Sequence, residues 1–327
     1  MTRHGGLWKF ALAAALCAVA PAPAPAAEPV SHTQAWPGLV SGETRAEMSA
    51  SLDAGQDLER GRAARFELAE HRRLDAALAA LAPQRKGVVD AYVVVVRFDS
   101  DAVFGREARE AGKVLERRYD AAGRTIVLGG DGGDGGGARM AMGSLHALAL
   151  ALARAAELMD PREDVLILYT TGHGTDAGLA YHDGNEGYGF LDPARLAGWL
   201  GELGIRNRLL ILSACYSGIF VPVLANDSTA LVTAASATRT SFGCTADNDW
   251  TFFGDAMINR ALRKPQPLGQ AAAEARGLIA GWEASKGYEP SDPQVSLGAR
   301  IDAWLKPLET RMPKSATAPV GRPPAGP

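Results

Sequence analysis

Two residues of the chain, His173 and Cys215, could together form a catalytic pair. Each follows a short apolar run, residues 165–169 before the histidine and 209–212 before the cysteine. Such runs are typical of buried parallel strands, and side chains just beyond these strands lie at the edge of the sheet where open α/β folds bind ligands. An imidazole there can accept a thiol proton, and the thiolate is the attacking species. The pattern predicts nucleophilic catalysis, with His173 as base and acid and Cys215 as nucleophile.

Both residues also have a purely structural interpretation. A cysteine at the end of a buried strand is most often a small hydrophobic residue, and a histidine in such a place often only makes hydrogen bonds. The pair favours chemistry because Gly174 and Gly218 leave nearby backbone uncovered, so that N–H groups could face a developing oxyanion. His182 competes as the base, but no apolar run directly precedes it, so its position is less determined.

The elements that would position the pair follow an α/β pattern. A β-branched run at 91–96 predicts a strand, and a helix at 103–118 and a strand at 125–128 complete a right-handed parallel βαβ unit. The further expected elements are a helix at 138–159, a polar loop at 176–190, a helix after the capping Asp192, a strand at 230–234, helices at 250–262 and 268–285, and a last strand near 294–297. The sum is one α/β domain with five or six mostly parallel strands and helices on both faces.

The residues after the two strands resemble the legumain (asparaginyl endopeptidase) family, within the caspase-like clan of cysteine peptidases. The resemblance rests on His173-Gly174 and on Ser-Ala-Cys-Tyr-Ser-Gly at 213–218, and the segment 232–255 is similar to the bacterial members in particular. It covers about residues 88–303. It implies a caspase-like three-layer sandwich, whose mostly parallel sheet is flanked by helices, and an endopeptidase. The thioester acyl-enzyme would be resolved by water, or by an amine in a transpeptidase.

The resemblance also implies roles for further residues. The backbone N–H groups of Gly174 and Cys215 would donate to the oxyanion. Arg106, Ser213 and Asp255 would form the primary specificity pocket, although the plant and animal members have an acidic residue in place of Ser213, which weakens any inference of asparagine specificity. Legumains also carry an asparagine just after the first strand that orients the histidine. Residues 97–101 contain none, and Asp99 or Asp101 could substitute.

The composition excludes some classes of partner. The chain has 327 residues, is 47% hydrophobic and carries a net charge of −3, and it has no basic run interleaved with aromatic residues. We therefore expect no nucleic-acid partner. The resemblance to the legumain family implies a peptide or protein as substrate. The six histidines and the cysteines lack the spacing of zinc ligands, so neither a metal nor another cofactor is expected.

The first residues have the pattern of a signal peptide. Arg3 and Lys9 give a positive start, 10–20 is largely apolar, and small residues follow up to Ala27. The apolar run is short for a membrane span, although an uncleaved anchor is the alternative. We expect a signal peptide at 1–27, a flexible lead-in and helix at 28–87, the peptidase domain at 88–308 and a disordered tail at 309–327. The protein would be periplasmic or secreted, with no membrane attachment after cleavage.

Signal cleavage would remove Cys17 and leave Cys215 and Cys244. In an exported chain these two could form a disulfide, and a bonded sulfur cannot be the nucleophile. The alternative function is therefore an inactive binding or scaffold domain with Cys215 and Cys244 oxidised together. A serine hydrolase is poorly supported, because the chain has no Gly-x-Ser-x-Gly motif.

Overall fold

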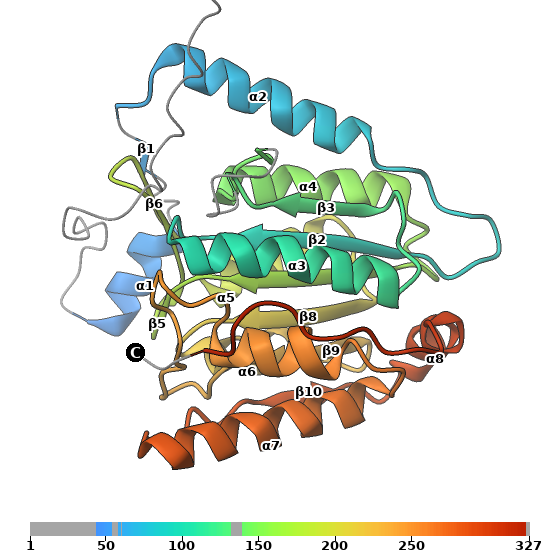
Figure 1. Cartoon of the computed structure of the whole chain (residues 1–327). Coiled ribbons are helices and arrows are strands. Elements are labelled where there is room, and N and C mark those ends of the chain that lie inside the picture. The colour runs from blue at the N-terminus through green and yellow to red at the C-terminus, as the bar shows by residue number, and fades with distance from the viewer. Residues whose placement is uncertain (1–43, 54–57, 60, 132–138, 325–327) are drawn as a thin grey trace, which may run out of the picture.

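The centre of the fold is a six-stranded sheet in the order β10-β9-β8-β4-β2-β3 (Figure 1). The computed structural model describes residues 44–53, 58–59, 61–131 and 139–324. The strands of this sheet are β2 (Ala91–Arg97), β3 (Thr125–Leu128), β4 (Val165–Thr171), β8 (Arg208–Ser213), β9 (Thr229–Thr233) and β10 (Val295–Leu297). All neighbouring strands are parallel except β10, which pairs antiparallel with β9. The predicted mostly parallel sheet is confirmed.

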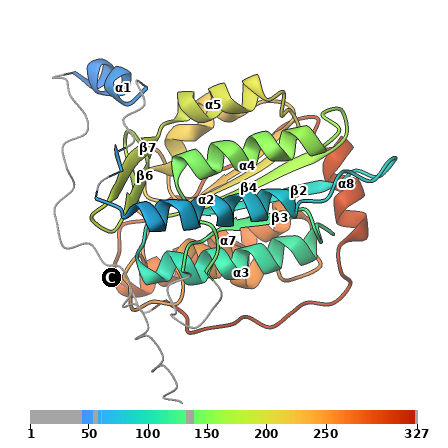
Figure 2. The same cartoon turned by 90° about the horizontal axis from the view of Figure 1, so that it is seen from above.

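Helices cover both faces of this sheet, as the second view shows (Figure 2). The α3 helix (Ala102–Arg118) and α7 helix (Leu268–Lys286) lie on one face, and α4 (Leu145–Leu158) and α5 (Pro193–Glu202) on the other. Strands β2, β4 and β8 are buried along their whole lengths, so their Val, Leu and Ile side chains fill two cores. This burial on both faces explains the continuous apolar runs of the sequence. The predicted three-layer α/β fold is confirmed.

Further helical elements occur in the described ranges. They are α1 (Arg45–Asp53), α2 (Ala64–Ala79), the 3-10 helix η1 (Ser217–Phe220), α6 (Val221–Leu224), the π-helix η2 (Gly254–Ala261) and α8 (Asp302–Arg311). None of the helices in the described ranges is long and apolar enough to cross a membrane.

The expected polar loop at 176–190 is wrong, because most of it forms an antiparallel hairpin. A second sheet has the order β1-β7-β6-β5, with β1 (Leu58–Glu59), β5 (Gly174–Thr175), β6 (Gly178–Asp183) and β7 (Gly187–Leu191). Leu179 and Tyr181 alternate along β6 and enter the core with Leu191, while the chain turns at Gly184 with a φ of +57°. The frequent glycines conceal this period of two in the sequence.

Parts of the lead-in and of the tail, which were predicted to be flexible or disordered, form a helix or contact the domain. The α1 helix lies within the lead-in, whereas the signal peptide at 1–27 lies outside the described residues, as does 132–138 of the glycine-rich run. Beyond α8 the tail runs along the domain (Figure 1). The indole N–H of Trp250 donates to the carbonyl of Val320 (2.9 Å), and Arg322 pairs with Asp249 (3.3 Å). These contacts give the proline-rich tail hydrogen bonds that it cannot make within itself.

Candidate active site

His173 lies just beyond β4, at the edge of the large sheet where the small sheet begins. Its ring packs edge-on against Phe104, with the ring centroids 5.1 Å apart, and its backbone carbonyl accepts a hydrogen bond from Ala180 N–H (3.0 Å). The side chain is 42% exposed. It is therefore fixed from one side and accessible from another, as a proton-transfer group must be.

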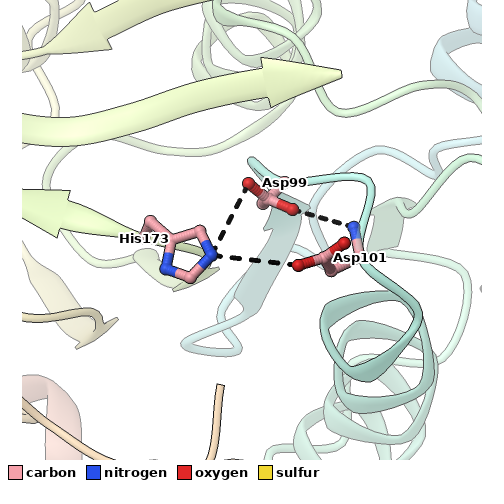
Figure 3. A group of neighbouring side chains, drawn as sticks. All are labelled: Asp99, Asp101 and His173. Carbon is pink, nitrogen blue, oxygen red and sulfur yellow. Dashed lines mark hydrogen bonds and ion pairs between the residues drawn. The ribbon is translucent and has the colours of Figure 1, made fainter. Parts of the chain in front are cut away.

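Two carboxylates from the loop between β2 and α3 face this imidazole (Figure 3). His173 Nε2 lies 3.9 Å from Asp99 Oδ2 and 4.0 Å from Asp101 Oδ2, which are distances of ion pairs rather than of hydrogen bonds. Burial lowers the pKa of His173, but the Asp101 and Asp99 carboxylates and Cys215 outweigh it, so the pKa is raised above its ordinary value. The surroundings thus favour the imidazolium form.

Cys215 lies two residues beyond the end of β8, where the chain turns sharply. Tyr216 takes a left-handed conformation with a φ of +56°, which is uncommon for a residue other than glycine. The hydroxyl of Ser217 secures the turn, because it donates to Ala214 O (2.8 Å) and accepts from Ala234 N–H (3.1 Å). These hydrogen bonds of Ser217 were not predicted, because the sequence shows only a serine two residues after Cys215.

The Cys215 sulfur has neighbours that stabilise a thiolate. The Cys244 thiol donates to it, which is the largest effect, and the N–H of Ser241 also donates (3.3 Å). Burial opposes these donors and His173 adds to them, and together they lower the pKa of Cys215 to about 6. The pKa of Cys244 is raised well above its ordinary value by the same hydrogen bond and by burial, so Cys244 keeps its proton. Of the two thiols, Cys215 is therefore the one whose thiolate form its surroundings favour.

The structure brings the predicted base, nucleophile and Gly174 to one edge of the sheet. His173 and Cys215 act on each other, since each shifts the other's pKa toward a thiolate and imidazolium pair. A Cβ on Gly174 would lie 2.2 Å from the Cys215 carbonyl oxygen and 3.0 Å from Ala214 Cβ. The two backbones are thus in direct contact. A Cβ on Gly218 would lie 2.4 Å from the backbone nitrogen of Ala237, so a glycine at this position permits close packing.

We expect Gly174→Ala to lower kcat/KM by about a hundredfold or more. The added methyl group would collide with the backbone of the nucleophile and push Cys215 away from His173. Steady-state kinetics on a peptide substrate measures the effect. Gly198→Ala, on exposed α5 surface with nothing within 4 Å of the new Cβ, is the matched control and should leave the kinetics unchanged. Wild-type kinetics in Gly174→Ala would show that this contact is not needed.

The three residues predicted to form a specificity pocket contact different partners. Arg106 donates to the carbonyls of Ala246 and Asn248, and so holds the loop that follows β9. Asp255 is fully buried and pairs with Arg260 of η2 (2.8 Å). Ser213, also buried, donates to a carboxylate inside the domain (3.1 Å). Each of the three side chains thus has a structural partner of its own, and their role in specificity stays a prediction.

Glu107, the carboxylate that Ser213 contacts, was not predicted as a site residue. It lies on α3, is fully buried, and accepts hydrogen bonds from Tyr169, Thr171 and Ser213 on one oxygen. Its other oxygen accepts from the N–H and the hydroxyl of Thr251, both at 2.9 Å. It therefore ties α3, two strands and the loop before η2 together beneath the site. The sequence offered one signal for its burial: this glutamate lies on the apolar face of the helix, between Phe104 and Ala111.

The competing base His182 lies on β6 and is less accessible than His173. Its side chain is 10% exposed, its Nδ1 lies 3.9 Å from Asp99 Oδ2, and its ring stacks on Tyr188 with the centroids 5.1 Å apart. The structure favours His173 as the base, because a general base must reach the proton that it removes.

Three of these side chains could also hold a metal ion. Ligand atoms of Asp99, Asp101 and His173 lie within 4.8 Å of one another. Imidazole and carboxylate donors suit several divalent cations, and clustered acidic groups are common without one. That the protein needs no metal stays a prediction.

Three comparisons with known proteins show what the chain is similar to. Residues 145–301 match the peptidase C13 family, a segment that contains both His173 and Cys215. No curated protein matches the chain significantly. Among solved structures, caspase-1 from Spodoptera frugiperda is 13% identical, with 67% of this chain and 93% of that chain covered and a TM-score of 0.41. The structure described as pro-sf-caspase-1 is 12% identical, with 65% and 92% covered and a TM-score of 0.41. Over residues 145–301, which hold both candidate catalytic residues, the chain is thus similar to the peptidase C13 family, the legumain-like cysteine peptidases.

Proposed function

We propose that the protein is a cysteine endopeptidase that cleaves peptide bonds through a Cys215–His173 dyad. One observation carries the proposal: at an accessible sheet edge, the pKa of Cys215 is lowered to about 6 and the pKa of the adjacent His173 is raised. A free thiol is only a few per cent ionised near neutral pH, whereas this sulfur would be mostly thiolate there. The ready thiolate is the species that attacks a peptide carbonyl.

The reaction follows from this pair. The Cys215 thiolate attacks the carbonyl carbon, and the negative charge that develops on the oxygen would face the N–H groups of Gly174 and Cys215. The His173 imidazolium gives its proton to the departing amine, the C–N bond breaks, and a thioester on Cys215 remains. Water, whose proton His173 then accepts, resolves the thioester to a carboxylic acid. An amine in place of water would give transpeptidation.

The competing function is an inactive domain in which Cys215 and Cys244 are oxidised together. Both are free thiols in the structure, and they lie close enough to share a hydrogen bond. A count of free thiols in the purified exported protein separates the functions. Two reactive thiols support the peptidase, and none supports the oxidised domain.

We also propose that the protein acts on peptides or proteins outside the cytoplasm. The signal-peptide pattern of residues 1–27 supports export, and the family match supports a protein substrate. Mass spectrometry of the protein recovered from a secreting host tests export. A mature mass that begins near residue 28 is the expected result, and an unprocessed N-terminus would contradict it.

Alkylation by iodoacetamide at a series of pH values tests the nucleophile. We expect the rate at Cys215 to rise through a pH of about 6 and to level off by neutral pH, because the thiolate is the reacting form. Peptide mapping by mass spectrometry assigns the modified residue, and Cys244, whose pKa is raised, is the internal control. A rate at Cys215 that rises only near the ordinary thiol pKa of about 8.5 would reject the assignment.

Digestion of a peptide library tests the activity itself and reports its specificity. Cleavage that disappears after Cys215 is alkylated supports a cysteine endopeptidase. A library left intact by the reduced enzyme would count against it.

A further inference from the structure

We propose that Asp101 and Asp99 act as an acidic pair that completes the catalytic apparatus, with Asp101 positioning His173 and Asp99 fixing Asp101 in place. The inference rests on the proposed function and deepens it. In this proposal both residues act through His173 and neither contacts the substrate, so both are positioning residues. The pair would take the place of the asparagine that the sequence lacks.

The Asp101 carboxylate faces the site, although its position at the start of α3 would favour helix capping. Asp101 is the N-cap residue of α3, where an aspartate side chain commonly accepts a hydrogen bond from its own helix. Here the side chain makes no capping hydrogen bond and instead lies with Oδ2 4.0 Å from His173 Nε2. A capping hydrogen bond would stabilise the helix, so its loss here indicates that the carboxylate serves another purpose. A position before the first turn of α3 also favours its negative charge.

Asp99 is the fully buried member, with no exposed side-chain area. Its Oδ1 accepts the backbone N–H of Asp101 at 2.8 Å, which fixes the residue that faces the histidine. Its Oδ2 lies 3.9 Å from both His173 Nε2 and His182 Nδ1. This one carboxylate oxygen thus lies within ion-pair distance of both imidazoles. His173 follows β4 of the large sheet, and His182 lies on β6 of the small sheet.

The hairpin holds the loop that carries the pair. His182 N–H donates to Phe98 O (2.8 Å), and Ser100 N–H donates to His182 O (3.0 Å). These backbone bonds flank Asp99 on both sides, so the small sheet fixes where its side chain lies. The hairpin missed in the sequence therefore supports the site directly.

This arrangement determines which nitrogen of His173 can act on the thiol. Nε2 faces the two carboxylates, and the other ring nitrogen points away from them (Figure 3). Nδ1 is then the nitrogen available to exchange a proton with Cys215. Carboxylates beside Nε2 stabilise the imidazolium that forms when the thiol is ionised, and hold the ring in one orientation. The titratable groups that act on His173 are Asp101, Asp99 and Cys215.

The test compares Asp101→Asn and Asp99→Asn with the wild type. Three readouts are needed: the pKa of His173 from imidazole NMR titration, the pH profile of Cys215 alkylation, and kcat and KM on a peptide substrate. We expect Asp101→Asn to lower the His173 pKa, because a negative neighbour is removed. The alkaline limb of kcat/KM should move to lower pH, and kcat should fall about tenfold to a hundredfold with KM nearly unchanged.

The controls separate positioning from loss of structure and from general charge effects. Asp101→Glu keeps the charge and should retain a raised His173 pKa. Asp176→Asn removes an exposed carboxylate that pairs with Arg45 near the same edge, and should leave all three readouts unchanged. If Asp99→Asn does not fold, Asp101→Asn alone decides.

An unchanged His173 pKa and unchanged pH profiles in Asp101→Asn would overturn the proposal, even if kcat fell. The His173 titration and the Cys215 alkylation need no substrate. They therefore test the role of the acidic pair even if the protein cleaves no peptide. A failure of the acidic pair is therefore distinguishable from a failure of the proposed peptidase function.

Discussion

Replacing Cys215 with alanine should abolish peptide-bond cleavage and lower kcat/KM by at least about 10⁴-fold. The neighbouring Cys244 cannot take over as nucleophile, since its pKa is raised well above the ordinary value and it keeps its proton. The polar groups around the site can still bind substrate, so KM should change far less than kcat. Digestion of the peptide library, followed by kinetics on the best sequence found, measures the loss.

His173→Ala should cause a loss of similar size, because a thiol without its base returns to the protonated form. The double variant should be hardly worse than either single variant, since the two groups act as one unit. His71→Ala is a matched control, because this histidine is exposed on α2 and pairs with Asp75 (3.3 Å). Equal unfolding temperatures would show that the losses are chemical. Cleavage by either purified catalytic variant at the wild-type rate would reject the dyad.

The strands of the large sheet could be predicted because each carries its own signal. The run of four valines in β2 and the apolar residues of β4 and β8 are buried on both faces, so their composition alone indicates a central parallel strand. The hairpin of β6 and β7 could not be recognised, since glycines and polar residues interrupt its alternation. The sequence predicted that the helix before β4 begins at residue 138, but α4 begins at Leu145. Ser144 caps it by accepting a hydrogen bond from Ala147 N–H (3.0 Å).

The site was predictable only where the reactive residue follows a strand. His173 and Cys215 meet that condition, and a parallel sheet brings the ends of neighbouring strands together. The hydrogen bond between Cys244 and Cys215 was not predictable, because it depends on how the loop after β9 folds back over the sulfur. For the same reason Asp99 and Asp101 could not be distinguished. Their parts depend on backbone contacts with a hairpin that the sequence conceals.

Replacing Glu107 with alanine should lower the free energy of unfolding by about 3 kcal/mol or more. The buried carboxylate accepts five hydrogen bonds, from Tyr169, Thr171, Ser213 and, twice, Thr251. Alanine would leave these donors without an acceptor in a site closed to solvent, and would open a cavity as well. Denaturant unfolding monitored by tryptophan fluorescence measures the loss, and Glu116→Ala on the same helix, which is not fully buried, is the control.

Glu107→Gln distinguishes the charge from the volume. Glutamine fills the same space, but its NH₂ group would face donors where an oxygen accepted them, so a loss of about 1–3 kcal/mol remains expected. Activity should fall in parallel, because Ser213 lies two residues before the nucleophile and Thr251 follows the loop that contacts its sulfur. A Glu107→Ala protein with wild-type stability would mean that the donors find other partners. One with lost stability but full activity would mean that Cys215 is positioned by its own turn, through Ser217, and does not need the carboxylate beneath it.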